Sequence, residues 1–248
     1  RQRQMCIRDS NGAQSGLASM AYAMSVLRSG QENAMLATGS DENSDIMTEL
    51  FGKLGVTSES VVTPFAGNDG FVLSDGSASV LIEDEKAARE RGARIYCHVA
   101  GYGMAHSNVK FGTLTGSEAG LTNAVNNALA DAGMTIDDID AVFGFANGMK
   151  AVDDVEIKGL TAVFGDKLAE KPVVELKEVL GESRAAAATT AAAHAALMFA
   201  GKIPSQEAYS IAADGSVSKT NVEASKLNNV LVAAYGAGGS YTAIVLSK

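Results

Sequence analysis

Cysteine and histidine, the residues that most often act as nucleophiles, bases or metal ligands, are few in this chain and lie far apart. The sequence holds three histidines, His98, His106 and His194, and two cysteines, Cys6 and Cys97. Two cysteines are too few for a disulfide framework or a zinc ribbon, and no HExxH motif, EF-hand loop or Walker-type phosphate loop occurs. We therefore predict no metal site, structural or surface roles for the histidines, and inert packing within a strand for Cys97.

Two further groups of residues have spacings that could serve chemistry. Asp153, Asp154 and Glu156 could supply a pair of catalytic carboxylates. Acidic residues at the start of a helix are also stabilised by the helix dipole, and we favour this structural interpretation. Residues 236–239, Gly-Ala-Gly-Gly, are more typical of a tight turn than of a phosphate-binding loop. Residue types and spacing alone therefore indicate a domain without visible catalytic machinery.

The composition argues against several classes of partner. The chain has 248 residues and a formal net charge of −9, so nucleic acid and anionic membrane surfaces are unfavourable partners. No apolar run reaches the roughly 18 residues that a membrane-spanning helix needs. No segment near residue 1 looks like a signal peptide and cysteines are scarce, so we expect a reducing, cytoplasmic location.

The first ten residues, RQRQMCIRDS, differ in character from the rest of the chain. They carry Arg1, Arg3 and Arg8 and lack the Ala, Gly and Ser content that follows Asn11. They resemble the in-frame translation of a sequencing adapter, and we predict that residues 1–10 are a non-native segment. The alternative is a genuine basic arm. On the first interpretation the natural protein would extend upstream, and this chain would be a fragment.

Hydrophobic patterning alternates between helix and strand along the whole chain. The pattern predicts helices over residues 16–29, 84–91, 117–132, 152–164 and 184–200. Short apolar runs predict strands at 33–38, 79–83, 94–102, 140–144, 173–176, 229–235 and 241–247. Strands that alternate with helices favour an α/β sheet structure.

Several short segments follow one another in an order that is more informative than any one of them. They are Gln14-Ser15-Gly16-Leu17, MLATGSDE at 35–42, Pro64-Phe65 with DGFVLSDG at 69–76, DDIDAVFGFANGMKAVDDVE at 137–156, VFGDK at 163–167, LKEVLGE at 176–182 and YGAGGS at 235–240. Taken together, they resemble the β-ketoacyl-(acyl carrier protein) synthases of the thiolase-like fold. The resemblance covers nearly all of residues 11–248 in family order.

This resemblance implies a fold and a division of the chain. Family members are pseudo-duplicated and form a five-layered αβαβα sandwich, so we expect an α/β, thiolase-like fold with an incomplete first half. Residues 11–110 would be the end of the N-terminal ketosynthase half and residues 111–248 the C-terminal half. The helix that begins at Gly16 would be the central buried helix. Strands missing from the first half would leave apolar surface exposed.

The resemblance also locates the family's catalytic positions, and all three are altered here. The family condenses acyl chains with a cysteine nucleophile at a helix N-terminus and two histidines. An ungapped match places Ala13 at the cysteine position, with Gln14 beside it, and Phe145 and Glu182 at the two histidine positions. Ala13 has no nucleophilic atom and Phe145 has no proton to give. An ionised Glu182 would place negative charge where the charge of the enolate develops.

The supporting positions of the family are partly retained. Lys177 and Glu156 match the lysine and the acid that support the histidines, so the resemblance implies an ion pair between them, and Lys177 could also neutralise Glu182. Ala237 replaces the aromatic residue that gates acyl entry in the family. We therefore place the tunnel gate at Ala237 and Gly238.

This pattern is similar to that of the chain-length factor, the ketosynthase β subunit of type II polyketide synthases. The resemblance implies a non-catalytic subunit that forms a heterodimer with an active ketosynthase α subunit in polyketide or fatty-acid-type chain elongation. It implies no cofactor other than acyl and malonyl groups carried on the phosphopantetheine of an acyl carrier protein, mainly through the partner subunit. We place the interface around the strand at 33–38, at Met35 and Leu36.

One alternative keeps the family's chemistry. The chain would then be a β-ketoacyl-acyl carrier protein synthase, an acyltransferase that performs decarboxylative Claisen condensation with a divergent active site. Many chain-length factors carry glutamine at the cysteine position, and a local shift in register could bring Gln14 there. Related glutamine-bearing ketosynthases decarboxylate malonyl units but need both histidines, so Phe145 and Glu182 argue against that role.

Overall fold

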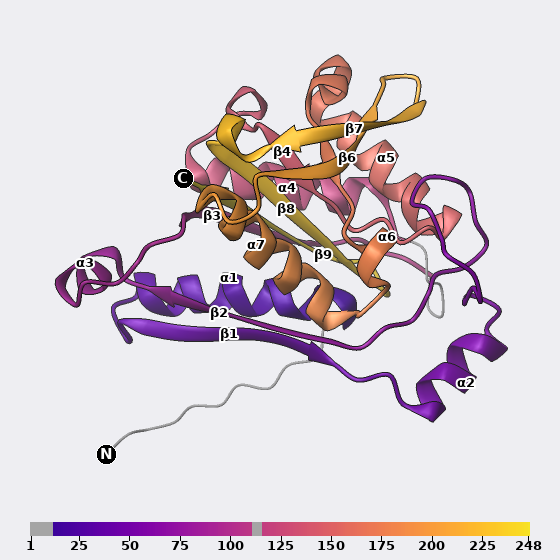
Figure 1. Ribbon diagram of the computed structural model, residues 1–248, viewed down its shortest axis with the longest axis horizontal. Coiled ribbons are helices and arrows are strands. Elements are labelled where there is room, and N and C mark those ends of the chain that lie inside the picture. Colours follow the sequence, from indigo (N-terminus) through magenta and orange to yellow (C-terminus); the bar gives the residue numbers. More distant parts are fainter. Residues whose placement is uncertain (1–11, 111–115) are drawn as a thin grey trace.

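The computed structural model describes residues 12–110 and 116–248 (Figure 1). The predicted adapter-derived segment, residues 1–10, lies outside these residues. Within the described ranges, no helix is long and apolar enough to cross a membrane.

A small antiparallel sheet is formed by strands β1 (Ala34–Asp41) and β2 (Gly76–Glu83). Their register runs without interruption from the Ala34–Glu83 pair to the Asp41–Gly76 pair. The other edge of β1 pairs with no strand among the described residues. On the outer face of this sheet, Leu36 and Leu81 lie directly opposite each other and are 67% and 55% exposed.

A seven-stranded mixed sheet forms the centre of the molecule, with strand order β3-β9-β8-β4-β5-β6-β7. The short strand β4 runs parallel to its neighbours β5 and β8, and the remaining pairs are antiparallel. Its strands are β3 (His98–His106), β4 (Ala141–Phe143), β5 (Val173–Val174), β6 (Ser205–Ile211), β7 (Val217–Glu223), β8 (Asn229–Gly236) and β9 (Ser240–Ser247).

The two sheets enclose a pair of central helices, α1 (Ser15–Arg28) and α7 (Ala185–Phe199), which contact strands of both sheets (Figure 1). On the far side of the large sheet lie α4 (Glu118–Ala132) and α5 (Lys150–Phe164). The shorter helices α2 (Asp45–Lys53), α3 (Glu85–Glu90) and α6 (Lys177–Leu180) lie at the margins. The order sheet, helices, sheet, helices gives four layers of the expected thiolase-like α/β sandwich.

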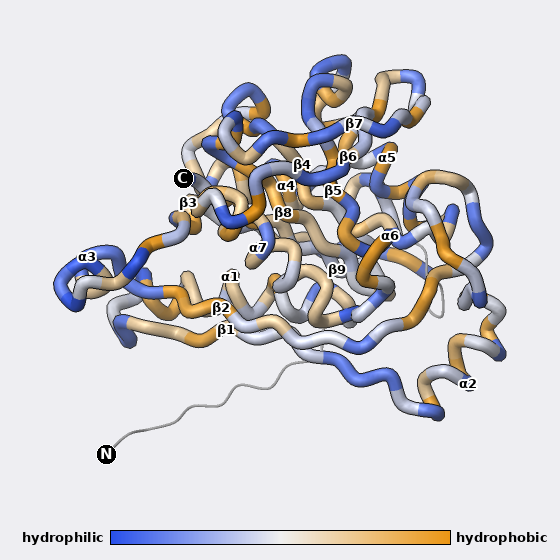
Figure 2. The backbone as a smooth tube through the Cα atoms, viewed as in Figure 1, coloured by the Kyte–Doolittle hydropathy of each residue, from blue (hydrophilic) through white to orange (hydrophobic). Residues whose placement is uncertain are grey.

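Alternation along the central strands supplies two apolar cores. In β8, Val230, Val232 and Ala234 point towards α1 and α7, whereas Leu231 and Ala233 point towards α4 and α5. A strand buried on both faces is apolar throughout, as parallel and central strands are. Figure 2 shows that hydrophobic residues lie in the central strands, whereas the turns around α3 at the margin are hydrophilic.

The central helices approach each other and β1 closely because small residues lie at the contact. A Cβ atom on Gly16 or on Gly39 would overlap the carbonyl oxygen of Ala185 and the hydroxyl of Thr189. The same added Cβ on Gly16 would lie 3.3 Å from the Cα of Gly39. Glycine at both positions therefore lets the backbones of α1, β1 and α7 pack directly together.

Several sequence-based expectations differ from the structure. The strand predicted at 94–102 lies at 98–106, so Cys97 precedes β3 instead of lying within a strand, and it is half-buried. Burial raises the pKa of its thiol to about 11, consistent with the expected inert role. Strand β3 pairs with β9 in the seven-stranded sheet, and the expected division of the chain at residue 110 stays a prediction. Helix α2 and the β6–β7 hairpin were not predicted.

Candidate functional site

The start of α1 places Ala13 and Gln14 in different surroundings. A 3₁₀ turn, Gly12–Gln14, leads into the helix. Ala13 lines a small cavity of about 20 Å³, together with Phe145 and Lys177. Gln14 is buried, and its Oε1 accepts a hydrogen bond from the hydroxyl of Thr242 on β9. Ala13 therefore lines the cavity, and Gln14 does not.

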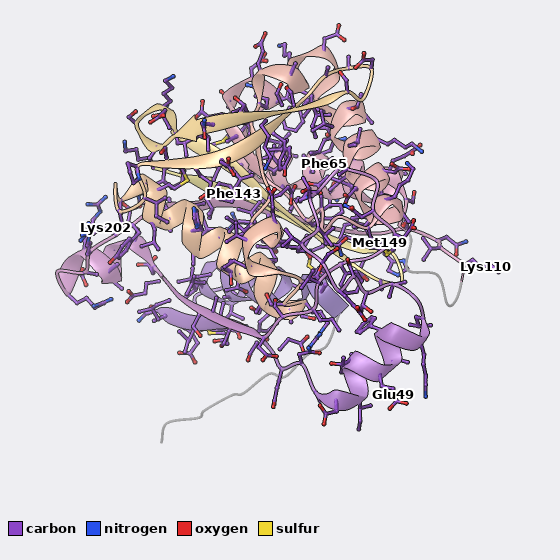
Figure 3. The ribbon with its side chains drawn as sticks, turned by 45° about the vertical axis from the view of Figure 1, so that its right-hand side comes forward. Glu49, Phe65, Lys110, Phe143, Met149 and Lys202 are labelled. Carbon is purple, nitrogen blue, oxygen red and sulfur yellow. The ribbon has the colours of Figure 1, made fainter. Side chains whose placement is uncertain are left out.

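Phe145 closes this cavity from the end of β4. It follows Gly144 directly after the strand, is 3% exposed, and packs against the ring of Tyr235 with the centroids 5.8 Å apart. Its N–H donates to both carboxyl oxygens of Glu156, at 3.1 and 3.0 Å, and its carbonyl accepts from Lys177 at 3.0 Å. Its backbone is therefore held at both polar groups while its side chain fills apolar space. Figure 3 labels Phe143, the last residue of β4, and Met149, which lies in the same core cluster as Phe145.

Lys177 forms its ion pair with Glu182 and not with Glu156. The prediction of a Lys177–Glu156 ion pair, which the resemblance implied, is therefore wrong. The Lys177 Nζ lies 2.7 Å from the Glu182 carboxylate, and the side chains are only 12% and 6% exposed. The short helix α6 and the turn at Gly181, where φ is 74°, bring the two ends of this segment together. The expectation that Lys177 neutralises Glu182 is confirmed.

Two further donors complete the partners of Glu182. The side-chain amide of Asn147 donates to its Oε2 at 3.0 Å, and the N–H of Arg184 donates to its Oε1 at 2.9 Å. The Glu182 carboxylate is thus fixed by one cation and two hydrogen bonds. It is a structural anion, with its oxygens directed at protein groups.

Glu156 faces a residue that the sequence analysis did not single out, Glu175. Both carboxyls are buried, and a Cβ atom on Gly144 would overlap an oxygen of each, so the two groups face each other across this glycine. Burial raises the pKa of Glu156 to about 7. Burial and the neighbouring Glu156 charge raise the pKa of Glu175 well above its usual range.

The acidic group at the start of α5 divides into two roles. Asp154 is paired with Lys150 on the surface, which is consistent with the helix-start interpretation. Asp153 is buried and accepts hydrogen bonds from the N–H groups of Phe65 at 2.7 Å, Asn147 at 3.0 Å and Gly148 at 3.2 Å. Burial raises the pKa of Asp153 in spite of these donors. Asp153 therefore organises the loop that follows Phe145.

The remaining predicted site residues lie away from the cavity. Ala237 and Gly238 are exposed in the turn between β8 and β9, as the tight-turn interpretation predicted, and do not line the cavity. The turn does reach the site indirectly, because a Cβ atom on Gly12 would lie 3.6 Å from the Cα of Gly236. On β1, Leu36 is exposed, whereas Met35 is half-buried against the core between the sheets.

The cavity has no thiol, imidazole or serine hydroxyl in its lining. Its lining contains no cysteine, serine or histidine; it consists of Ala13, Gly144, Phe145, Leu176, Lys177, Ala187, Ala188, Ala191, Ala233, Ala234 and Tyr235. A cavity of about 20 Å³ has room for roughly one water molecule. None of the three histidines lines it, and among the described residues no group of His, Cys, Asp and Glu side chains is arranged to hold a metal ion.

Comparison with known proteins places the chain in a family. The profile of the β-ketoacyl synthase N-terminal domain matches residues 8–88, and that of the β-ketoacyl synthase C-terminal domain matches residues 96–210. The tetracenomycin polyketide synthase ketoacyl synthase alpha subunit of Streptomyces glaucescens is 28% identical over 96% of the chain, which covers 59% of that protein. The 3-oxoacyl-acyl-carrier-protein synthase 2 of Coxiella burnetii is 31% identical over 49% of the chain.

Solved structures agree with the sequence matches. The ishigamide ketosynthase/chain length factor superposes with a TM-score of 0.83 at 26% identity, covering 96% of this chain and 59% of that chain. A β-ketoacyl synthase from Burkholderia phymatum has the same fold, with a TM-score of 0.83 at 22% identity. The chain spans roughly half the length of the curated relatives it matches. The two domain matches, in order and on a shared fold, show that the chain belongs to the β-ketoacyl synthase family.

Proposed function

We propose that this chain is a non-catalytic ketosynthase-like subunit of the chain-length-factor type, which pairs with an active β-ketoacyl synthase in polyketide or fatty-acid-type chain elongation. The observation that carries the proposal is the cavity at the start of α1. Ala13 lines it in place of a nucleophile, the buried Phe145 lines it in place of a histidine, and Glu182 is paired with Lys177. The likeness to a ketosynthase/chain length factor structure supports the same assignment.

In this proposal the chemistry belongs to the partner subunit. Acyl and malonyl groups would arrive on an acyl carrier protein and react at the partner's cysteine, so this chain needs no cofactor of its own. Its contribution would be to complete the dimer and to shape the space in which the product grows, in the cytoplasm.

Condensation assays test this division of labour. With malonyl-loaded carrier protein, the chain alone is expected to yield no product above a protein-free reaction, because it has no thiol to acylate at the cavity. A complex with an active β-ketoacyl synthase that has the family's cysteine is expected to form product. Replacing the partner's catalytic cysteine with alanine is expected to abolish that product. Condensation by this chain alone would overturn the proposal.

The proposed interface includes the outer face of β1 and β2, which we define by Leu36, Leu81, Thr38 and Ser79. Leu36 is the better probe of pairing than Met35, because Met35 also packs against the core. Leu36→Asp is expected to weaken the complex on the order of 30-fold, as the loss of an apolar interface anchor does.

The matched control for this variant is Leu54→Asp, which adds the same charge at an apolar residue of similar exposure, 55%, beyond the end of α2. Affinity is measured by co-purification and by titration of one subunit into the other. Circular dichroism checks that both variants keep the wild-type fold. If Leu36→Asp binds as tightly as Leu54→Asp, the interface lies elsewhere.

A further inference from the structure

Glu156 and Glu175 form a buried carboxyl pair that the proposed function does not use. Glu156 comes from α5 and is fully buried, whereas Glu175 follows β5 and is 4% exposed. The two face each other across Gly144, where no side chain could fit. The pair lies directly behind the segment that closes the cavity, because Glu156 also accepts the N–H of Phe145.

The hydrogen bonding of this pair requires a proton. No N–H or O–H donor of the described residues reaches either oxygen of Glu175, and its Oε1 lies beside the Oε1 of Glu156 at Gly144, where a single added Cβ atom would overlap both. Two ionised carboxylates have no hydrogen to share, so one member must be protonated. Glu156 is the acceptor already fixed by a backbone N–H, which leaves Glu175 as the donor.

The residues around the pair do not supply a cation that could neutralise two ionised carboxylates. Lys177, the cation nearest to the pair, gives its ammonium group to Glu182 and to the carbonyl of Phe145. Asp153 on α5 adds negative charge, and Tyr209 on β6 donates its hydroxyl to Glu178. With no cation bound to either carboxyl, the pair is most stable when a proton lies between its members.

We propose that the Glu156–Glu175 pair is a pH-operated latch, in which a shared proton holds the Gly144–Phe145 segment closed over the cavity. When the proton is lost, two negative charges face each other across Gly144. The repulsion displaces the Glu156 carboxylate from the Phe145 N–H and loosens the segment. This inference stands whether or not the chain condenses acyl groups.

The direction of the pH dependence follows from the raised pKa values of both carboxyls. A raised pKa in the folded state means that the folded chain binds more protons than the unfolded chain above the usual glutamate range. The stability that the pair contributes is therefore full at low pH and is lost progressively as pH rises through the raised pKa values of the two carboxyls, about 7 for Glu156 and well above the usual range for Glu175. The latch is closed in acid and opens in base.

Denaturation of the full chain from about pH 5 to about pH 8 tests the shared proton, with Glu175→Gln as the informative variant. Glutamine keeps a donor to Glu156 but cannot ionise. As pH rises, the unfolding equilibrium constant of the wild type is expected to increase more than that of Glu175→Gln. The extra increase is up to about tenfold per pH unit. Glu170→Gln, at an exposed glutamate, is the control and should follow the wild type. Equal slopes for the wild type and Glu175→Gln overturn the proposal.

Two further measurements cover the case in which Glu175→Gln folds poorly. The wild type at neutral pH is expected to show the infrared carbonyl band of a protonated carboxylic acid, and its absence would overturn the shared proton. Amide hydrogen exchange across residues 142–148, corrected for intrinsic rates, is expected to lose protection as pH rises. Protection that does not change with pH in the wild type would overturn the latch.

Discussion

Replacement of Lys177 with methionine is expected to lower the free energy of unfolding by about 3–5 kcal/mol, because it leaves a buried carboxylate without its cation. Methionine keeps most of the length and apolar stem of lysine. The loss of stability is therefore due to the missing charge and not to a new cavity. Glu182 is 5% exposed and would keep only the donors from Asn147 and Arg184. Chemical denaturation of both proteins at one pH measures the difference.

The matched control is Lys150→Met. Lys150 lies at the same distance of 2.7 Å from Asp154, but these side chains are 62% and 40% exposed. Surface pairs of this kind contribute about 0–1 kcal/mol, so this variant should be close to the wild type. Adding Glu182→Gln to Lys177→Met should restore part of the lost stability. Equal small losses for both lysine variants would show that the Lys177–Glu182 pair is not desolvated.

Replacement of Gly39 with valine is expected to cost about 3 kcal/mol or more, although valine favours β-strands. The new Cβ would overlap the carbonyl oxygen of Ala185, and backbone cannot move aside as a flexible side chain can. Strand β1 would be forced away from α7, and the core between the two sheets would open.

Thr38→Val serves as the control for this second variant. Thr38 is the preceding residue of β1, and its side chain is exposed on the outer face, where it bonds to Ser79. The substitution there should change the unfolding free energy only slightly. Thermal and denaturant unfolding of the two variants give the comparison, and a stable Gly39→Val protein would show that the close approach of β1 and α7 is not required.

Elements with strong periodicity could be predicted from the sequence to within a few residues. The helix expected at 16–29 is α1, and the strands expected at 229–235 and 241–247 are β8 and β9. The β6–β7 hairpin was missed although Asp214-Gly215 lies between its strands, a dipeptide that favours tight hairpin turns. Its strands carry few apolar residues because β7 is the edge of the sheet, so the apolar-run criterion did not find them.

The candidate site could be predicted where it depends on local order and not where it depends on tertiary contacts. Ala13 and Phe145 face one cavity, as their places in the family motifs imply. Both Glu156 and Glu182 were expected as partners of Lys177, and only the fold shows that the ion pair forms with Glu182. Glu175 was missed since it faces Glu156, 19 positions earlier in the chain, across a glycine. The sequence did contain a signal for a buried carboxyl, because Glu175 lies inside the apolar run at 173–176.

The contact of α1, β1 and α7 explains how a chain with this fold can keep its structure when its reactive side chains are replaced. The three backbones meet where side chains are absent or small, at Gly16, Gly39 and Ala185. Ala13 and Phe145, which the proposed function places at the family's reactive positions, line a cavity outside this contact. Substitutions at the cavity therefore cost little stability, whereas substitutions at the glycines of this contact cost much more. A chain of this kind can lose its chemistry by single substitutions and still present an unchanged shape to a partner.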